Sequence, residues 1–228
     1  RFYSQNAIIN RLGFNNKGVN YLVERIKNRK FQGVLGVNIG SNKNSRGRKL
    51  INDYIECFTK VAPHADYITV NISSPNTQNL RTLHTEEKLI PLFKALQKAR
   101  NDLCFKKPIF IKLSPDEGNE IIPRVISAIN QFKFDGVIVS NTTISRDNIT
   151  LNSKNKIEGG LSGQPLFKQS NKMLEMIHQE NINLIKIGVG GVFTKENFIQ
   201  KKRLGASLVQ IYTSFIYEGP QIIKKLLD

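Results

Sequence analysis

Short apolar runs of strand length alternate with segments of helical periodicity along the chain, and this alternation constrains its fold most. The helical segments carry apolar stripes, for example Leu50, Tyr54 and Phe58. Strands that are apolar on both faces and are joined by amphipathic helices are what a buried parallel sheet requires. The predicted strands are Val34–Ile39, Tyr67–Ile72, Pro108–Leu113, Gly136–Ser140, Leu184–Val189 and Leu208–Tyr212.

Polar and glycine residues gather at the carboxyl ends of these strands: Asn38, Asn71, Lys112, Asn141, Gly190 and Tyr212. An α/β fold, the (β/α)8 TIM barrel, places its active site on this rim. Only six strand–helix units are visible, and the last two strands end in glycine- and hydroxyl-rich segments, as phosphate-binding strands seven and eight do. We therefore expect one barrel domain over residues 1–228, without its first two strands. A doubly wound open sheet is the alternative.

The composition indicates a soluble globular protein, with 39% hydrophobic and 23% charged residues among 228. Two cysteines and three histidines without ligand spacing predict no metal site. The formal charge of +16 admits nucleic acid or an anionic membrane surface as partner. Lysine and arginine are spread along the chain, however, and the densest clusters, such as Lys201–Arg203, are expected on helix surfaces. Nucleic-acid binding is therefore not expected.

The segment Asn71–Asn76 turns an apolar strand abruptly polar at its end. Pro75 fixes its own φ and restricts Ser74 before it, so the Ser74 hydroxyl is presented in a defined direction. Ser74 is therefore a candidate catalytic residue. The alternative is a polar turn in which Ser74 only forms local hydrogen bonds.

Several motifs occur together in a specific order and spacing, and the chain from about Asn10 onward resembles the dihydroorotate dehydrogenase family. The segments that carry the resemblance are Asn10–Asn16, Gly36–Gly40, Asn71–Thr77, Lys112–Asp116, Ser140–Thr143, Gly159–Pro165, Gly188–Gly191 and Leu208–Thr213. The resemblance implies an FMN cofactor at the top of a barrel and oxidation of dihydroorotate to orotate in pyrimidine synthesis. A proton leaves C5 while a hydride passes from C6 to the flavin.

Ser74 matches the position of the family's catalytic base. Class 1 members have cysteine there, and class 2 members, which associate with membranes and reduce quinone, have serine. A serine hydroxyl is a weak base and needs a relay to carry the proton away. Phe14 and Thr77 match positions that shape this relay.

The resemblance also implies two sets of binding residues. Carboxamide side chains can donate and accept hydrogen bonds, so they can bind the amide-like edges and the carboxylate of orotate. Glycines have no side chain, so they let backbone N–H groups approach a phosphate. Lys112 is a cation that can stabilise the reduced flavin. The substrate set is Asn10, Arg11, Leu12, Gly13, Phe14, Asn71, Asn76, Asn141 and Thr142. The FMN set is Asn38, Asn71, Lys112, Ser140, Ser162, Gly163, Gly190, Gly191, Tyr212 and Thr213.

Parts of the family pattern are missing. These are the first barrel strand with its flavin loop and lysine, and the N-terminal helices that form the quinone tunnel and the membrane contact. We therefore expect this chain to hold FMN poorly by itself, with the quinone site outside it. The parent enzyme is expected peripherally on the bacterial inner membrane, or on the mitochondrial inner membrane in a eukaryote.

Three other functions stay open. A class 1 enzyme would use fumarate or a nicotinamide acceptor. A tRNA dihydrouridine synthase binds nucleic acid, which would explain the net charge of +16. Such an enzyme needs an active-site cysteine as its general acid, however, and Cys57 and Cys104 are expected on helices away from the rim. An inactive fragment would bind acidic polymers in a steeply salt-dependent way.

Overall fold

The computed structural model describes residues 1–73, 86–118, 120–150, 157–181 and 183–228. Its main sheet has six parallel strands in the order β2-β3-β4-β5-β7-β8. Each strand lies within a predicted run, although β2 begins later than Val34 and β8 ends before Tyr212. The strands are β2 Gly36–Ile39, β3 Tyr67–Asn71, β4 Ile109–Leu113, β5 Gly136–Val139, β7 Ile185–Val189 and β8 Leu208–Gln210.

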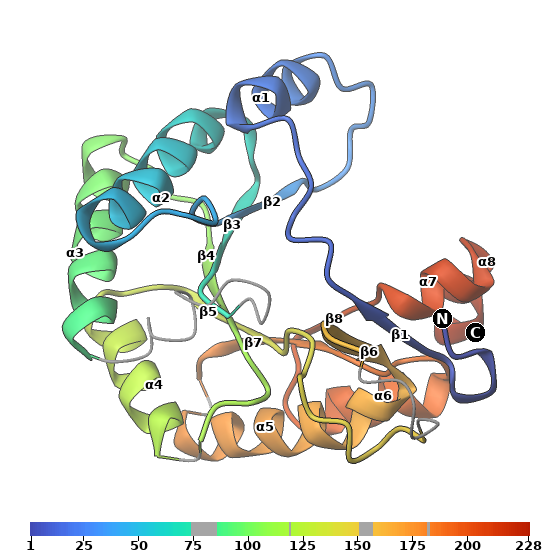
Figure 1. The fold of residues 1–228 in the computed structure, drawn as a ribbon. Helices are drawn as coiled ribbons and strands as arrows, with labels where there is room; N and C mark the ends of the chain where they lie inside the picture. Colours follow the sequence, from blue (N-terminus) through green and yellow to red (C-terminus); the bar gives the residue numbers. More distant parts are fainter. Residues whose placement is uncertain (74–85, 119, 151–156, 182) are drawn as a thin grey trace.

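The sheet is a partial TIM barrel. Its strand order follows the sequence without reversal, whereas a doubly wound sheet reverses direction at a switch point. Successive right-handed crossovers then place all helices on one side, and in Figure 1 the helices from α2 to α6 follow the outside of the curled sheet. The doubly wound alternative is therefore wrong. Among the residues described, β2 and β8 each pair on one side within this sheet, so it is an open arc.

Amphipathic helices cover the outer face of the sheet. Tyr54 and Phe58 of α2 are fully buried, as is Phe93 of α3. They belong to one hydrophobic core with the strand residues that point outward, such as Ile111 and Val137. The helices are α1 Val19–Lys27, α2 Gly47–Val61, α3 Glu86–Asp102, α4 Ile121–Gln131, α5 Phe167–Glu180, α6 Lys195–Arg203, α7 Thr213–Glu218 and α8 Gln221–Leu227, with short 3-10 turns η1 Tyr3–Gln5, η2 Ala62–His64 and η4 Gln164–Leu166.

The other face of the sheet points into the curl. Phe110, Ile138 and Ile187 form a separate small cluster there. Side chains alternate between the two faces along a strand. Lys112 lies two residues after Phe110, so it shares this inner face, and it pairs in register with Asn71 of β3. The alternation therefore turns the polar strand ends toward the interior of the arc.

An antiparallel two-stranded ribbon, which we did not predict, lies beside the main sheet. It joins β1 (Ala7–Asn10) to β6 (Gly160–Gly163). The strand β6 lies inside the segment that the sequence indicates only as a functional loop. Gly163 has a φ of 98°, and a Cβ there would be 2.1 Å from the carbonyl oxygen of Asn6. Only glycine allows the ribbon to close this tightly.

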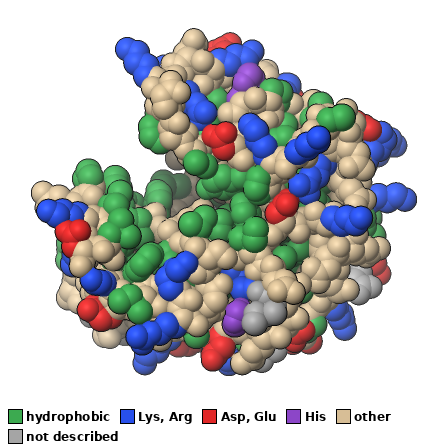
Figure 2. Space-filling view, turned by 180° about the vertical axis from the view of Figure 1, so that it is seen from behind, with side chains coloured by type: hydrophobic (Ala, Val, Ile, Leu, Met, Phe, Trp, Pro, Cys, Tyr) green, Lys and Arg blue, Asp and Glu red, His purple; other side chains and the backbone are tan. Residues whose placement is uncertain are grey.

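Figure 2 shows lysine and arginine side chains scattered over one face of the molecule, with hydrophobic side chains lining a hollow between two lobes. This distribution is typical of a solvated basic surface. No helix in the described ranges is both long and apolar enough to cross a bilayer. No group of three or more histidine, cysteine or acidic side chains in these ranges could hold a metal ion.

Candidate active site

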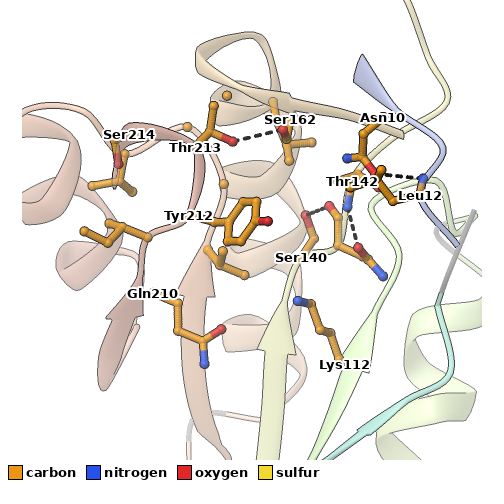
Figure 3. A pocket seen from close by; sticks show the side chains of 18 of the residues that line it. Asn10, Leu12, Lys112, Ser140, Thr142, Ser162, Gln210, Tyr212, Thr213 and Ser214 are labelled. Carbon is orange, nitrogen blue, oxygen red and sulfur yellow. Dashed lines mark hydrogen bonds between the residues drawn. The ribbon is translucent and has the colours of Figure 1, made fainter. Parts of the chain in front are cut away.

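A cavity of about 420 Å³ opens at the carboxyl ends of β4, β5, β7 and β8, and the ribbon and the segment after β1 form its other walls. Figure 3 shows side chains from β4, β8, the ribbon and the segments after β1 and β5 around it. Most of the predicted site residues line it. They are Asn10, Leu12, Gly13, Phe14, Lys112, Ser140, Asn141, Thr142, Ser162, Gly163, Gly190, Gly191, Tyr212 and Thr213.

Lys112 projects from the inner face of β4 into this cavity (Figure 3). Its ammonium group forms no hydrogen bond or ion pair with any residue whose placement is described. Burial lowers the pKa of Lys112 because the charged form loses solvation. An electron-rich or anionic ligand beside this side chain would therefore favour its charged form.

A cradle of hydroxyl groups and glycines closes the cavity between the ribbon and β8. Thr213 Oγ1 donates to Ser162 Oγ at 2.9 Å, and Ser162 Oγ donates to the carbonyl of Ile8 at 3.2 Å. Gly190 and Gly191 have φ values of 115° and 74°. Successive backbone N–H groups without covering side chains form an anion-binding concavity.

A carboxamide cluster lies beside the cradle, at the ends of β3 and β5. Asn141 Nδ2 donates to Ser73 Oγ at 3.1 Å and approaches Asn71 Oδ1 at 3.4 Å. Ser73 Oγ donates to Asn71 Oδ1 at 3.0 Å. Thr142 N donates to Asn141 Oδ1 at 2.8 Å, which fixes the orientation of that amide. The cluster is thus built before any ligand arrives.

The chain matches a known family along its whole length. The family model described as dihydroorotate dehydrogenase matches residues 1–228. The chain belongs to this family. It is 44% identical over 227 residues to dihydroorotate dehydrogenase (quinone) of Acinetobacter baylyi, covering 97% of this chain and 68% of that protein. The protein of the same name from Legionella pneumophila is 40% identical, with 100% of this chain and 70% of that protein covered.

Solved structures of family members have the same fold. The crystal structure of DHODH from Eimeria tenella in complex with ferulenol superimposes with a TM-score of 0.91 at 32% identity. The match covers 99% of this chain and 67% of that one. The ligand-free Eimeria tenella structure gives a TM-score of 0.89 at 33% identity. The chain therefore spans about two thirds of the family members it matches.

Some predicted residues lie elsewhere. Arg11 is exposed and pairs with Glu158 outside the first cavity. Asn38 and Asn71 line an adjacent cavity of about 780 Å³, together with Phe14 and Cys57. Cys57 is thus closer to the site than its helical position suggests, although burial raises the pKa of its thiol. Ser74, Asn76 and Thr77, which include the predicted base of this family, lie outside the described residues.

Sequence reasoning missed other residues that line the first cavity. Gln210 ends β8 on the same face as the other inward-pointing side chains, and Phe193 follows the glycine pair. Position at a strand end was a usable signal for Gln210. Leu166 and Ser214 also line the cavity, and nothing in the pattern singles them out.

The carboxamide cluster rests on a buried tyrosine. Tyr54 is fully buried, and its hydroxyl donates to the carbonyl of Asn71 at 2.6 Å. We expect Tyr54→Phe to lower the free energy of unfolding by about 1–3 kcal/mol, because the carbonyl loses its buried donor. Urea denaturation measures this. Tyr21→Phe, at a ring 43% exposed on α1, is the matched control. Equal stability of the two variants would refute the role of this hydrogen bond.

Proposed function

We propose that the chain is the FMN-binding barrel region of a quinone-dependent dihydroorotate dehydrogenase, residues 1–228 forming one domain. In this function (S)-dihydroorotate is oxidised to orotate for pyrimidine synthesis, and the electrons leave to a quinone. The observation that carries the proposal is the convergence of Lys112, Asn141 and the Gly190–Gly191 turn on one cavity. The relatives named dihydroorotate dehydrogenase (quinone) support the reaction and the acceptor.

The cavity fits a flavin mononucleotide in chemistry. Its volume of about 420 Å³ is within the range of small-molecule sites, roughly 300–1,000 Å³. The cradle of Ser162, Gly163, Gly190, Gly191 and Thr213 offers backbone and hydroxyl donors for a phosphate. Lys112 would face the ring system with its positive charge. Bound FMN supplies the hydride acceptor for the reaction.

Carboxamides would bind and orient the substrate. Asn10 Oδ1 accepts the N–H of Leu12 at 3.4 Å, which leaves its Nδ2 to donate to a ligand (Figure 3). Asn71 and Asn141 are held by the buried Ser73. Orotate carries amide-like edges and a carboxylate, and carboxamides pair with both.

Ser74 would remove the proton from the substrate. Its predecessor Ser73 is held on three sides, because its N–H donates to Asn71 Oδ1 at 3.2 Å, its carbonyl accepts from Asn141 at 3.2 Å and its hydroxyl bonds both side chains. Ser73 is thus held in a fixed position against Asn141, which lines the cavity. Phe14, which borders both cavities, and Thr77 would shape the path by which the proton leaves.

The acceptor separates this proposal from a class 1 enzyme. The two named relatives are called quinone enzymes, and Ser74 stands where class 1 has cysteine. We place the enzyme peripherally on the inner membrane, bacterial or mitochondrial, with the quinone site and the membrane contact on a segment outside this chain.

Anaerobic mixing tests the proposal. The purified chain is supplied with FMN and mixed with dihydroorotate while flavin absorbance is followed, and decylubiquinone, fumarate or NAD⁺ is then added. The chain by itself is expected to hold FMN poorly; fused to the family's upstream segment, with its two strands and quinone site, it should show flavin bleaching and reoxidation by the quinone alone. Reoxidation by fumarate or NAD⁺ would favour class 1. Bound FMN without bleaching would refute the reaction, and absence of FMN binding would call for the same test with the family's two upstream strands fused to the chain.

A further inference from the structure

One buried lysine has no role in the function described above. Lys201 on α6 is fully buried, although the sequence places its cluster on a helix surface, so that prediction is wrong for this residue. Its neighbours Lys202 and Arg203 are exposed, as predicted. None of the ion pairs found within the described ranges includes Lys201. A buried lysine without a carboxylate partner is costly, which calls for a reason.

The contacts of Lys201 lead to the glycine turn of the cavity. Its Nζ donates to Ser170 Oγ at 2.7 Å and approaches the carbonyl of Val189 at 3.5 Å. Ser170, also fully buried, has its Oγ 3.3 Å from the carbonyl of Gly190. Val189, Gly190 and Gly191 line the cavity on their other side. Lys201 therefore lies directly behind the turn that would receive a phosphate.

We propose that Lys201 is a positioning residue for an anionic group bound at the Val189–Gly191 turn, acting through Ser170 and through its own buried charge. The inference rests on the proposed function and extends it to a residue that does not touch the ligand. A charge in the interior acts across a few residues because solvent does not screen it well. A phosphate in front of the turn would supply the negative charge that Lys201 lacks.

In the ligand-free protein, the protonation of Lys201 is sensitive to an anion bound nearby. Burial lowers its pKa to about 7, so a large fraction of the side chain is neutral at physiological pH. An anion at the turn favours the charged form and raises this pKa. The protein should therefore take up a fraction of a proton when it binds the anion at a pH between about 7 and the raised pKa of Lys201. Its affinity for the anion should fall as the pH rises through this window.

No other titratable group packs against the Lys201 ammonium among the residues described. Its contacts are Ser170 and the Phe167 ring on α5 and Gly188 and Val189 on β7. Lys186 on β7 bonds the carbonyls of Asn181 and Leu184, and His178 packs on Gly205. The remaining charged side chains of the surrounding helices are exposed: Lys168, Lys172, Glu175 and Glu180 on α5, Lys195, Glu196, Lys202 and Arg203 on α6, and Lys224 and Lys225 on α8.

Thermal stability gives a first test without ligand. The unfolded lysine has a pKa of about 10.4, above that of folded Lys201, so the unfolded chain binds more protons between about pH 7 and pH 10. Wild type should therefore gain stability as pH rises through this window. Lys201→Met should melt at a higher temperature than wild type at about pH 6, and the difference should shrink toward about pH 9. A lower melting temperature at every pH would assign Lys201 a purely structural role and overturn the proposal.

Flavin binding gives the decisive test. Titration calorimetry in two buffers of different ionisation enthalpy measures the affinity and the proton uptake for FMN and for riboflavin, which lacks the phosphate. If the anion raises the pKa of Lys201 from about 7 by about one unit, FMN affinity falls about fivefold from pH 7 to pH 9 through this group. Lys201→Met should bind FMN about fivefold more weakly at pH 7 and lose this proton uptake. Riboflavin affinity should be the same in both proteins.

Two further variants separate the roles. Ser170→Ala keeps the charge and breaks the link to Gly190, so it should weaken FMN binding but retain proton uptake. Lys202→Met, on the exposed neighbour, should match wild type in every measurement. Unchanged FMN affinity and proton uptake in Lys201→Met would overturn the inference and leave the proposed function standing. A wild-type chain that binds riboflavin and FMN equally well would also overturn it. If the chain fused to the family's two upstream strands binds neither flavin, the cofactor proposal on which the inference rests is removed.

Discussion

Replacement of Ser74 by alanine is expected to slow the reduction of bound flavin by dihydroorotate by about 10²–10⁴-fold, the usual contribution of a positioned general base. Substrate affinity should change little, because the carboxamide cluster that would bind the substrate is held by Ser73 and Tyr54. Anaerobic stopped-flow absorbance of the flavin, as a function of dihydroorotate concentration, separates the reduction rate from the apparent dissociation constant.

Two variants control this experiment. Ser74→Cys should retain reduction, because a thiolate can remove the proton directly and the side chain differs by one atom. Ser73→Ala removes a neighbouring hydroxyl that bonds Asn71 and Asn141, so it should weaken substrate binding more than it slows proton removal. Reduction of Ser74→Ala at the wild-type rate would show that another group is the base.

The main sheet could be predicted because its strands are apolar on both faces. Ile111 and Val137 face the helices, and Phe110 and Ile138 face the curl. A strand buried on both sides leaves a continuous apolar run in the sequence. The polar residue that interrupts the run, such as Lys112, then marks the rim. For this reason the sequence pattern predicts many of the residues that line the cavity.

The ribbon could not be predicted in the same way. Gly160–Gly163 contains two glycines and a serine, so it carries little strand signal. Its partner Ala7–Asn10 lies about 150 residues earlier, and Leu161 pairs there with Ile9. Such a pairing is decided by tertiary contacts, including the hydrogen bond at 2.9 Å from the Tyr217 hydroxyl to the carbonyl of Ala7. Local sequence does not encode it.

Buried charge was the other feature that the sequence concealed. Lys201 stands among exposed residues in Lys195–Arg203, and a stretch this polar predicts a solvated face. Packing against β7 decides otherwise, because Gly188 leaves space that the stem of Lys201 fills, a Cβ there being 3.0 Å from Lys201 Cδ. A glycine on a strand thus makes room for the stem of a lysine on a distant helix, a relation that pattern alone does not show.

Replacement of Gly191 by alanine is expected to weaken FMN binding by about 10²-fold, the effect of a displacement of about 1 Å in a preorganised site. A Cβ on Gly191 would lie 2.7 Å from the Cα and 2.8 Å from the N of Phe167. Backbone atoms at the start of α5 cannot yield as a flexible side chain does, so the turn itself must shift. The N–H groups that would bind the phosphate shift with it. Flavin fluorescence quenching measures the affinity.

Gly219→Ala is the matched control. Gly219 has a φ of 69°, close to the 74° of Gly191, but a Cβ there meets no atom within 4 Å. Both variants place alanine at a positive φ, which costs stability in each. Only Gly191→Ala adds the collision with Phe167. The difference in FMN affinity between the two variants therefore reports the geometry of the turn, and equal affinities would show that the phosphate binds elsewhere.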